Sequence, residues 1–214
     1  MQSVKLSQKR ILFIGAHADD ECCCAGTLYR SLEEGSEVFL ATLSFCEEDS
    51  KQLGFPPDIL KSEFECCVET LGINKNNIYT SDYPVRNFPQ YRQEILDYLV
   101  LIKKEVKPDL VLIPSSIDIH QDHKVVYEEG LRAFAYSSIL GYETPKNLLP
   151  QKHICYIDFK KRHFEVKEKC RACYQSQDKR AGIDRETKLL LARIRGSQIG
   201  CEYAEGYETL CLKI

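Results

Sequence analysis

The chain has 214 residues, of which 43% are hydrophobic and 29% are charged, and its formal net charge is −3 at pH 7. These proportions are ordinary for a globular protein in water, and the charge gives no electrostatic reason to expect a nucleic-acid partner. No apolar stretch approaches the roughly 18 residues of a membrane-spanning helix. Residues 1–5 also lack the apolar segment of a secretory signal. We therefore expect a cytoplasmic protein without a membrane span, folded as a single domain over residues 1–214.

Eleven cysteines are a large and odd number for a chain of this length. Because nothing in the sequence indicates export, we expect reduced thiols rather than a disulfide framework. Cys170 and Cys173 have the C-x-x-C spacing of many zinc sites, but no second pair completes such a site. Packing as small apolar side chains explains most of the cysteines, and a redox or metal-ligand role is the alternative.

Strands and helices are expected to alternate along the chain. The expected strands cover residues 11–16, 37–43, 77–80, 109–113, 153–159 and 208–213. The expected helices cover residues 25–34, 59–71, 90–105, 124–136, 164–176 and 186–195. Residues 44–58, which follow the second strand, are expected to form a long loop. This order predicts an α/β fold with a mostly parallel sheet and helices on both of its faces.

Ionisable side chains directly follow two of the expected strands. The first cluster is His17, Asp19, Asp20 and Glu21, and the second is Asp118, His120, Asp122 and His123. In an open parallel sheet, ligands bind at the C-terminal ends of the strands. A catalytic zinc ion usually has three protein ligands of the histidine and carboxylate type, with a fourth position left for water. His17, Asp20 and His123 supply such a set, so the two clusters together predict a metal site.

Either cluster by itself would be weaker evidence for this site. Acidic residues cap many helices without binding a metal, and an isolated His-x-Asp-His sequence would fit an exposed loop. Dinucleotide binding has little support, because Gly15 and Gly26 do not form a G-x-G-x-x-G fingerprint. The argument for a metal site therefore depends on both clusters lying at strand ends.

The motifs A-H-x-D-D-E, at residues 16–21, and H-x-D-H, at residues 120–123, resemble those of the LmbE/PIG-L family of zinc-dependent N-deacetylases. The resemblance implies a Rossmann-like fold and hydrolysis of the acetamide of an N-acetylglucosamine-type sugar conjugate, with release of acetate. It also implies a role for each matching residue. His17, Asp20 and His123 would be the zinc ligands, Asp19 the general base, His120 the partner of the developing oxyanion, and Asp122 the residue that orients a histidine. Such a ligand set also accepts Fe²⁺ or Co²⁺, so Zn²⁺ is expected with these metals as alternatives.

Weaker similarities to the family extend along the rest of the chain. Glu63 lies in the segment where the family has R-x-x-E, but Leu60 replaces the arginine. In relatives this arginine helps to hold the substrate, and Arg86 is the candidate for a substrate-binding substitute. The other similarities are Lys169, Ser176 and Gln177 in a K…S-Q segment, and Tyr203–Tyr207 in a Y-A-E-x-F segment.

The expected partner is a small-molecule sugar conjugate. The resemblance leaves open which N-acetyl sugar it is, and a metal-dependent hydrolase of a non-sugar amide is the main alternative. A non-catalytic sugar-binding module and a thiol redox protein are further alternatives. Relatives often form oligomers, so a homo-oligomer is also considered.

Overall fold

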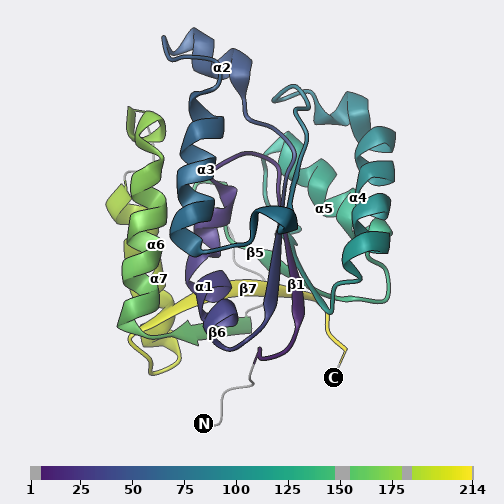
Figure 1. Ribbon diagram of the computed structural model, residues 1–214. Coiled ribbons are helices and arrows are strands. Elements are labelled where there is room, and N and C mark those ends of the chain that lie inside the picture. Colours follow the sequence, from purple (N-terminus) through teal and green to yellow (C-terminus); the bar gives the residue numbers. More distant parts are fainter. Residues whose placement is uncertain (1–5, 148–154, 180–184, 214) are drawn as a thin grey trace.

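The computed structural model describes residues 6–147, 155–179 and 185–213, and in these residues a seven-stranded sheet lies between helices on both sides (Figure 1). The strands are β1 Arg10–Gly15, β2 Glu37–Thr42, β3 Ile78–Thr80, β4 Leu110–Pro114, β5 Ser138–Tyr142, β6 Cys155–Phe159 and β7 Tyr203–Cys211. The α-helices are α1 Ala25–Glu33, α2 Glu47–Gln52, α3 Ile59–Leu71, α4 Arg92–Val106, α5 Gln121–Ala133, α6 Lys161–Cys173 and α7 Arg185–Gln198. In the described part of the chain, none of these helices has the length and apolar character required to cross a membrane.

The strand order in the sheet is β3-β2-β1-β4-β5-β7-β6. The first five strands in this order, β3, β2, β1, β4 and β5, run parallel to one another. β7 pairs antiparallel with both β5 and β6. The prediction of a mostly parallel sheet in an α/β fold is therefore confirmed. β1 and β4 are direct neighbours, with Ile11 opposite Leu110, so the loops that follow these two strands leave the same edge of the sheet side by side.

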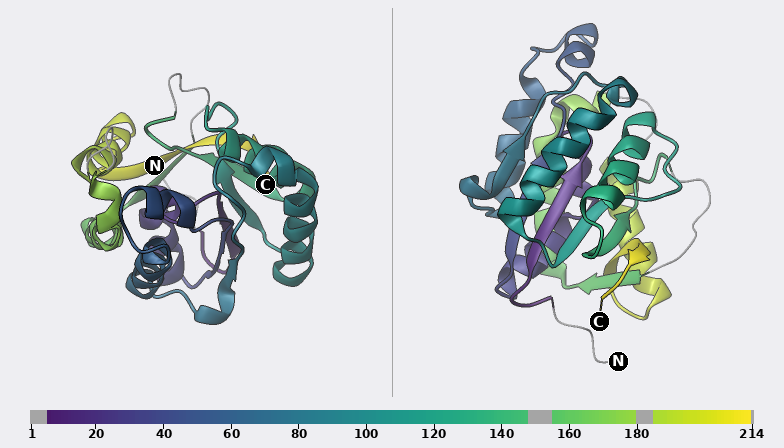
Figure 2. Two further views of the ribbon diagram at one scale, coloured as in Figure 1. Left: turned by 90° about the horizontal axis from the view of Figure 1, so that it is seen from above. Right: turned by 90° about the vertical axis from the view of Figure 1, so that its right-hand side faces the viewer.

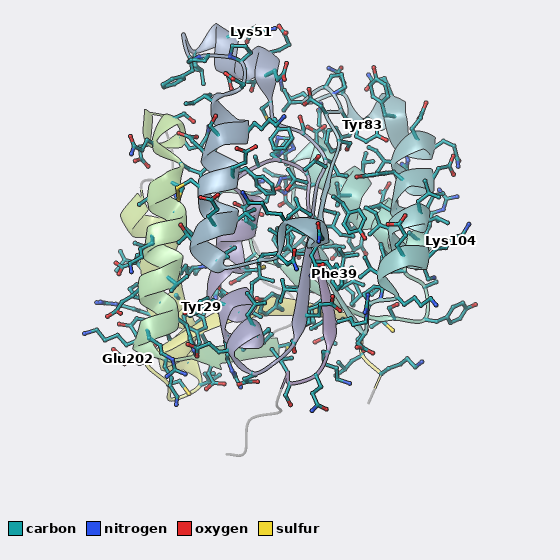
Figure 3. The ribbon with its side chains drawn as sticks, in the orientation of Figure 1. Tyr29, Phe39, Lys51, Tyr83, Lys104 and Glu202 are labelled. Atoms are coloured by element: carbon teal, nitrogen blue, oxygen red, sulfur yellow. A yellow bond between two sulfur atoms is a disulfide. The ribbon has the colours of Figure 1, made fainter. Side chains whose placement is uncertain are left out.

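Alternate residues of the central strand β1 face opposite helical layers. Ile11 and Phe13 pack in the hydrophobic cluster that includes α1, α3 and α6. Leu12 and Ile14 pack in the cluster that includes α4 and α5. All four side chains are fully buried, because a parallel strand with helices on both faces has no solvent-exposed side. Figure 2 shows the two helical layers from above and from the side, and Figure 3 shows the side chains that fill the space between them and the sheet, with Phe39 labelled on β2.

The structure differs from the expected elements mainly in the second half of the chain. Strand β5 was not expected at all, and β7 begins at Tyr203 instead of residue 208. β7 contains Glu205 and Glu208 among buried neighbours, so its sequence lacks the apolar run by which a strand is recognised. In the first half, the expected loop 44–58 contains the short helix α2. His153, at the start of an expected strand, lies outside the described residues.

The expectation of reduced thiols is wrong for one pair of cysteines. Cys66 in α3 and Cys173 in α6 form a disulfide, with their Cα atoms 5.8 Å apart, although reduced thiols were expected throughout. The structure also distinguishes two lysines near the K…S-Q segment, whose burial was not predicted. Lys169 is exposed on α6, whereas Lys167, one half-turn earlier, is 4% exposed and bonded to buried groups. Sequence spacing could not reveal which lysine faces inward until the helix had been placed on the sheet.

Candidate metal centre

The two ionisable clusters meet at the C-terminal edge of the sheet. β1 ends at Gly15 and β4 ends at Pro114, and their loops bring His17, Asp20 and His123 together. One nitrogen or oxygen atom of each of these three residues lies within 4.8 Å of those of the other two. The distances from Asp20 Oδ2 are 3.9 Å to His17 Nδ1 and 3.5 Å to His123 Nε2. Two imidazole nitrogens and a carboxylate oxygen at this spacing suit a zinc-type metal ion.

His17 and His123 each bond to a buried carboxylate through the ring nitrogen that faces away from Asp20. His17 Nε2 lies 3.0 Å from Asp122 Oδ2, and His123 Nδ1 lies 2.7 Å from Asp118 Oδ2. Metal-binding histidines are usually oriented by such bonds, which also fix the tautomer that offers a lone pair to the metal. The donor set of this chain therefore fits a bound metal ion. The family resemblance of the sequence implied an orienting role for Asp122 but none for Asp118.

The carboxylates also control the charge of the site. Burial opposes ionisation of Asp122, but the hydrogen bond and charge of His17 outweigh it and hold the pKa of Asp122 below its usual value. Burial likewise opposes protonation of His123, but Asp20 and Asp118 outweigh it and raise the pKa of His123 to about 9. A histidine must be neutral at the atom that binds a metal, so metal binding would release the proton held at His123.

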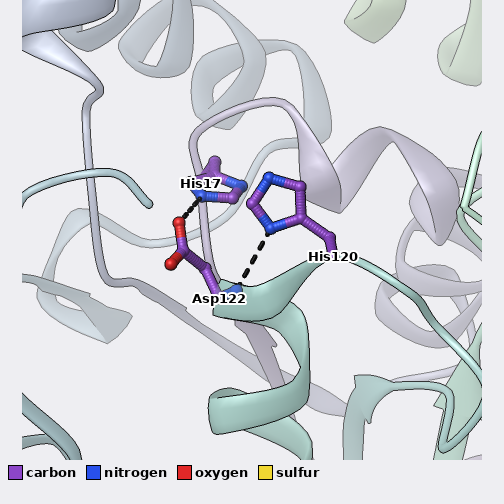
Figure 4. A group of neighbouring side chains, drawn as sticks. All are labelled: His17, His120 and Asp122. Carbon is purple, nitrogen blue, oxygen red and sulfur yellow. Dashed lines mark hydrogen bonds and ion pairs between the residues drawn. The ribbon is translucent and has the colours of Figure 1, made fainter. Parts of the chain in front are cut away.

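His120 lies beside His17 and Asp122 (Figure 4), but its hydrogen bonding differs from that of His17 and His123. It precedes α5, and its Nδ1 accepts a hydrogen bond of 3.2 Å from the backbone N–H of Asp122. Burial, with the nearby His17 and His123, lowers the pKa of His120 to about 4. The neutral ring therefore has its proton on Nε2, which leaves an N–H donor at the site. His17, His120 and Asp122 also form a close group, but the hydrogen bonds just described already occupy Asp122 and one nitrogen of His120.

Asp19 lies on a turn with an unusual backbone conformation. Its φ angle is 104°, a region that residues other than glycine rarely adopt. The carboxylate of Glu21 holds this turn, because its Oε2 accepts a 3.2 Å hydrogen bond from the backbone N–H of Asp19. Burial raises the pKa of Glu21 to about 7, although a hydrogen bond from the Tyr174 hydroxyl opposes the rise. Strained residues of this kind are frequent at functional sites.

A pocket opens next to these residues. It is lined by His17, Ala18, Asp19, Asp20, Cys46, Asp49, Leu60, Val85, Arg86, His120, His123, Thr144, Lys146, Asn147, Arg171 and Gln177. Cys46 and Asp49 belong to the segment that was expected to be a loop, and they contribute to the pocket wall. The predicted metal ligands, Asp19 and His120 therefore all face one cavity.

Arg86, the candidate substrate-binding residue, also lines this pocket. Its backbone N–H donates to Asp122 Oδ2 at 2.6 Å, and its guanidinium pairs with the carboxylate of Asp49. The φ angle of Arg86 is 64°, so this residue, like Asp19, has a left-handed backbone at the edge of the site. Arg86 thus helps to position Asp122 through its main chain, which the sequence did not reveal.

Lys167 of α6 and Glu205 of β7 support the loop that contains the candidate metal ligands. Lys167 Nζ donates to the carbonyl oxygens of Cys22 and Cys23, at 2.6 and 2.9 Å, and to Glu205 Oε1 at 2.5 Å. Glu205 also accepts hydrogen bonds from the backbone N–H groups of Gly26 and Thr27 at the start of α1, at 3.0 and 2.9 Å. A carboxylate at a helix N-terminus satisfies N–H groups that have no partner within the helix.

Comparisons with known proteins agree with this geometry. Residues 12–134 match the model of the family PIG-L, described as GlcNAc-PI de-N-acetylase. A protein of Escherichia coli (strain K12), the uncharacterized deacetylase YaiS, is 29% identical over 166 residues, which cover 75% of this chain and 87% of YaiS.

Two solved structures have a similar fold. The conserved protein TT1542 from Thermus thermophilus has a TM-score of 0.75 at 20% identity, with 96% of this chain and 97% of that chain covered. The N,N'-diacetylchitobiose deacetylase from Pyrococcus horikoshii has a TM-score of 0.70 at 21% identity, with 94% and 83% covered. These TM-scores show a shared fold. The family match covers more than half of the sequence. The chain belongs to the PIG-L family of deacetylases, as its two motifs had predicted.

Proposed function

We propose that this protein is a zinc-dependent N-deacetylase that hydrolyses the acetamide of an N-acetylglucosamine-type sugar conjugate and releases acetate. The observation that supports the proposal most strongly is the convergence of His17, Asp20 and His123 in a pocket that also contains Asp19. In this proposal the single catalytic domain extends over residues 1–214.

The side chains divide the chemistry between them. A zinc ion held by His17, Asp20 and His123 would polarise the amide carbonyl and make water a stronger nucleophile at neutral pH. Asp19 accepts a proton from the attacking water and then delivers it to the nitrogen of the leaving amine. The C–N bond breaks, the acetyl carbon leaves as acetate, and the sugar keeps a free amine. A positioned carboxylate of this kind contributes about 10²–10⁴-fold to the rate.

His120 stabilises the negative charge that develops on the carbonyl oxygen. Its Nδ1 is occupied by the backbone N–H of Asp122, so its Nε2–H is available as a hydrogen-bond donor to this oxygen. The removal of one such donor typically costs about 10²–10³-fold in rate. Asp122 and Asp118 hold His17 and His123 in the orientation that metal binding requires.

The relatives provide the reason for a sugar substrate. YaiS is named as a deacetylase, and the Pyrococcus horikoshii protein is named for a chitobiose derivative. Fe²⁺ and Co²⁺ are alternatives to Zn²⁺ for the same ligands. We further propose that the protein acts in the cytoplasm on a small-molecule conjugate. A non-sugar amide as substrate and a non-catalytic sugar-binding role are the alternatives.

Metal content and acetate release test the proposal together. The wild-type protein is compared with Asp19→Asn, His123→Ala and, as a control outside the pocket, Asp97→Asn on α4. The substrates are N-acetylglucosamine, its 1-phosphate and N,N'-diacetylchitobiose. We expect about one metal per chain and acetate release from the wild type and Asp97→Asn. Asp19→Asn should keep the metal and lose at least about 10²-fold in rate, and His123→Ala should lose both.

The possible results separate the alternatives. Metal without acetate from any sugar, but with hydrolysis of another acetamide, would favour a non-sugar amide as substrate. Sugar binding with no hydrolysis at all would favour a binding module. A wild-type protein that binds no zinc, iron or cobalt at micromolar concentration would contradict the proposal as a whole.

A further inference from the structure

A buried arginine lies in the wall of the pocket. Arg171, in α6, is only 2% exposed, and it lines the pocket together with the metal ligands and Leu60. The guanidinium group stays charged in proteins and has five N–H donors. Such a group is rarely buried unless it is fully paired, so the partners of Arg171 are informative.

The hydrogen bonds of Arg171 leave one side of its guanidinium unused. Nη1 donates to the carbonyl oxygen of Tyr174 at 3.0 Å, and Nη2 donates to Asp178 Oδ1 at 2.8 Å. Nε is buried and has no hydrogen-bond acceptor among the residues that the structure describes. A buried donor without a partner costs about 1–3 kcal/mol, and more when it belongs to a charged group. Nε itself is closed to the pocket, but Nη1 and Nη2 each have a second N–H beyond these bonds, and Arg171 lines the pocket.

Two contacts with α3 fix the position of this arginine. The disulfide between Cys66 and Cys173 joins α3 to the last turn of α6. Just beyond that turn, the carboxylate of Glu63 accepts hydrogen bonds from the backbone N–H and the hydroxyl of Ser176, at 2.8 and 2.6 Å. Arg171 is thus held in place before any ligand arrives, which lowers the entropic cost of binding one.

We propose that Arg171 is the substrate-anchoring residue of this protein, and that it binds an anionic oxygen group, a phosphate or a carboxylate, on the sugar conjugate. The inference rests on the proposed function, since it assigns the substrate class of the same pocket. Guanidinium groups match the geometry of carboxylate and phosphate oxygens. Lys146 lines the same pocket, as does Arg86, whose guanidinium is paired with Asp49. α3 places the apolar Leu60 at the pocket, and α6 places the cationic Arg171 there.

Binding measurements test this inference without turnover. Zinc-loaded protein with the substitution Asp19→Asn is titrated calorimetrically with N-acetylglucosamine, N-acetylglucosamine 1-phosphate and N-acetylmuramic acid. The second and third ligands distinguish a phosphate from a carboxylate. We expect at least one anionic sugar to bind about tenfold or more tightly than the neutral one. Adding Arg171→Met should raise the Kd of this anionic sugar by about tenfold or more, with little effect on the neutral sugar.

Two further variants separate charge from position. Arg171→Lys keeps the charge without the guanidinium geometry and should recover only part of the affinity. Lys104→Met removes a positive charge from the exposed face of α4, where Figure 3 labels Lys104, and should leave both affinities unchanged. The combination Leu60→Arg with Arg171→Leu returns the cation to the pocket from α3. Recovery of anion binding in this combination would show that any loss in Arg171→Met was not caused by misfolding.

The inference and the proposed function can fail separately. Equal binding of neutral and anionic sugars, no binding of any of the three, or an unchanged Kd in Arg171→Met would overturn the role of Arg171. If the wild type releases acetate under these conditions, the deacetylase proposal nevertheless stands. Conversely, Arg171-dependent binding of an anionic sugar with no acetate release would support the anion site and contradict the deacetylase proposal.

Discussion

His17 and His123 of the candidate metal centre are each held by a carboxylate at the ring nitrogen that faces away from Asp20. Asp122 bonds to His17 and Asp118 bonds to His123. Both carboxylates are fully buried, and each also accepts backbone N–H groups, from Arg86 to Asp122 and from His120 to Asp118. Because water does not compete with these bonds, the orientation of the histidines is fixed before a metal binds.

Asp118→Asn tests this orientation at the level of one residue. The amide can still accept a hydrogen bond, but it lacks the negative charge that raises the basicity of His123. We expect zinc affinity to fall by about 10–100-fold, measured by competition with a chromophoric chelator. Glu65→Gln on the exposed face of α3 removes a carboxylate that does not line the pocket, and it serves as the control. Unchanged zinc affinity in Asp118→Asn would contradict a role for Asp118 in metal binding.

At the level of elements, α6 connects the pocket to the rest of the helical layer. It packs against α1 and α3, and it joins α3 covalently through Cys173 and Cys66. The N-terminal turn of α6 contacts the C-terminal turn of α1, where Arg162 and His163 both bond to Glu33, at 2.6 and 2.7 Å. These contacts lie at opposite ends of α6, so they hold the whole helix in position.

The disulfide between α3 and α6 should stabilise the fold. The two cysteines are 107 residues apart in the sequence, and closing so long a loop restricts the unfolded chain strongly. We expect Cys173→Ser to lower the free energy of unfolding by about 2–4 kcal/mol, measured by urea denaturation under non-reducing conditions. Cys201→Ser, at an exposed free cysteine, should have little effect. Equal stability of the two variants would show that the bond does not form in solution.

The contact between α1 and α6 should make stability depend on pH. The hydrogen bond from Arg162, with a smaller contribution from His163, lowers the pKa of Glu33 from 4.5 to about 2. A carboxyl whose folded pKa lies below its unfolded value stabilises the protein above the unfolded pKa. The contribution of Glu33 is therefore present above about pH 4.5 and is lost as the pH falls toward 2.

Glu33→Gln tests this dependence. Because Arg162 is 53% exposed, solvent screening makes the stabilisation from this ion pair small near pH 7. Thermal unfolding should show a small difference from the wild type at pH 7, and the difference should shrink between pH 4.5 and 2. Glu65→Gln should show no comparable dependence. A gap between Glu33→Gln and the wild type that grows on acidification would contradict the assignment.

At the level of the whole molecule, residues from distant parts of the chain support the loop after β1, which contains the predicted ligands His17 and Asp20. The ion pair of Lys167 and Glu205 joins α6 to β7. Lys167 also bonds to the carbonyl oxygens of Cys22 and Cys23, just after the predicted ligand Asp20. The side chains of Lys167 and Glu205 are 5% and 6% exposed. The C-terminal strand therefore supports the N-terminal metal loop through a buried pair of charges.

Lys167→Met should be strongly destabilising, because it leaves the carboxylate of Glu205 buried without its cation. We expect a loss of about 3–5 kcal/mol in the free energy of unfolding, measured by chemical denaturation. Lys169→Met, at an exposed position on the same helix, is the matched control and should change stability by less than about 0.5 kcal/mol. Similar losses of unfolding free energy in the two variants would contradict a stabilising role for the buried pair of Lys167 and Glu205.

The sequence was most informative where local pattern and tertiary environment agree. The helix expected over residues 59–71 has the observed bounds of α3, because its apolar spacing and Gly72 are both local signals. The start of α5 was placed three residues too late, since Asp122 and His123 in its first turn are polar residues that face the site. The last strand was expected to begin at residue 208, whereas β7 begins at Tyr203. The reason is related, because Glu205 is buried only through partners on other elements.

The sequence by itself determined the α/β class, the family and the two clusters that meet at the metal centre. Strand ends and their ionisable residues are local features, and the parallel sheet brings the ends of β1 and β4 to one edge. Only the tertiary structure decided that Asp118 orients His123, that Lys167 is the buried lysine, and that Arg171 enters the pocket from α6. Each of these depends on which side of a helix or loop faces a distant part of the chain. That choice is made by packing between elements, which sequence spacing does not record.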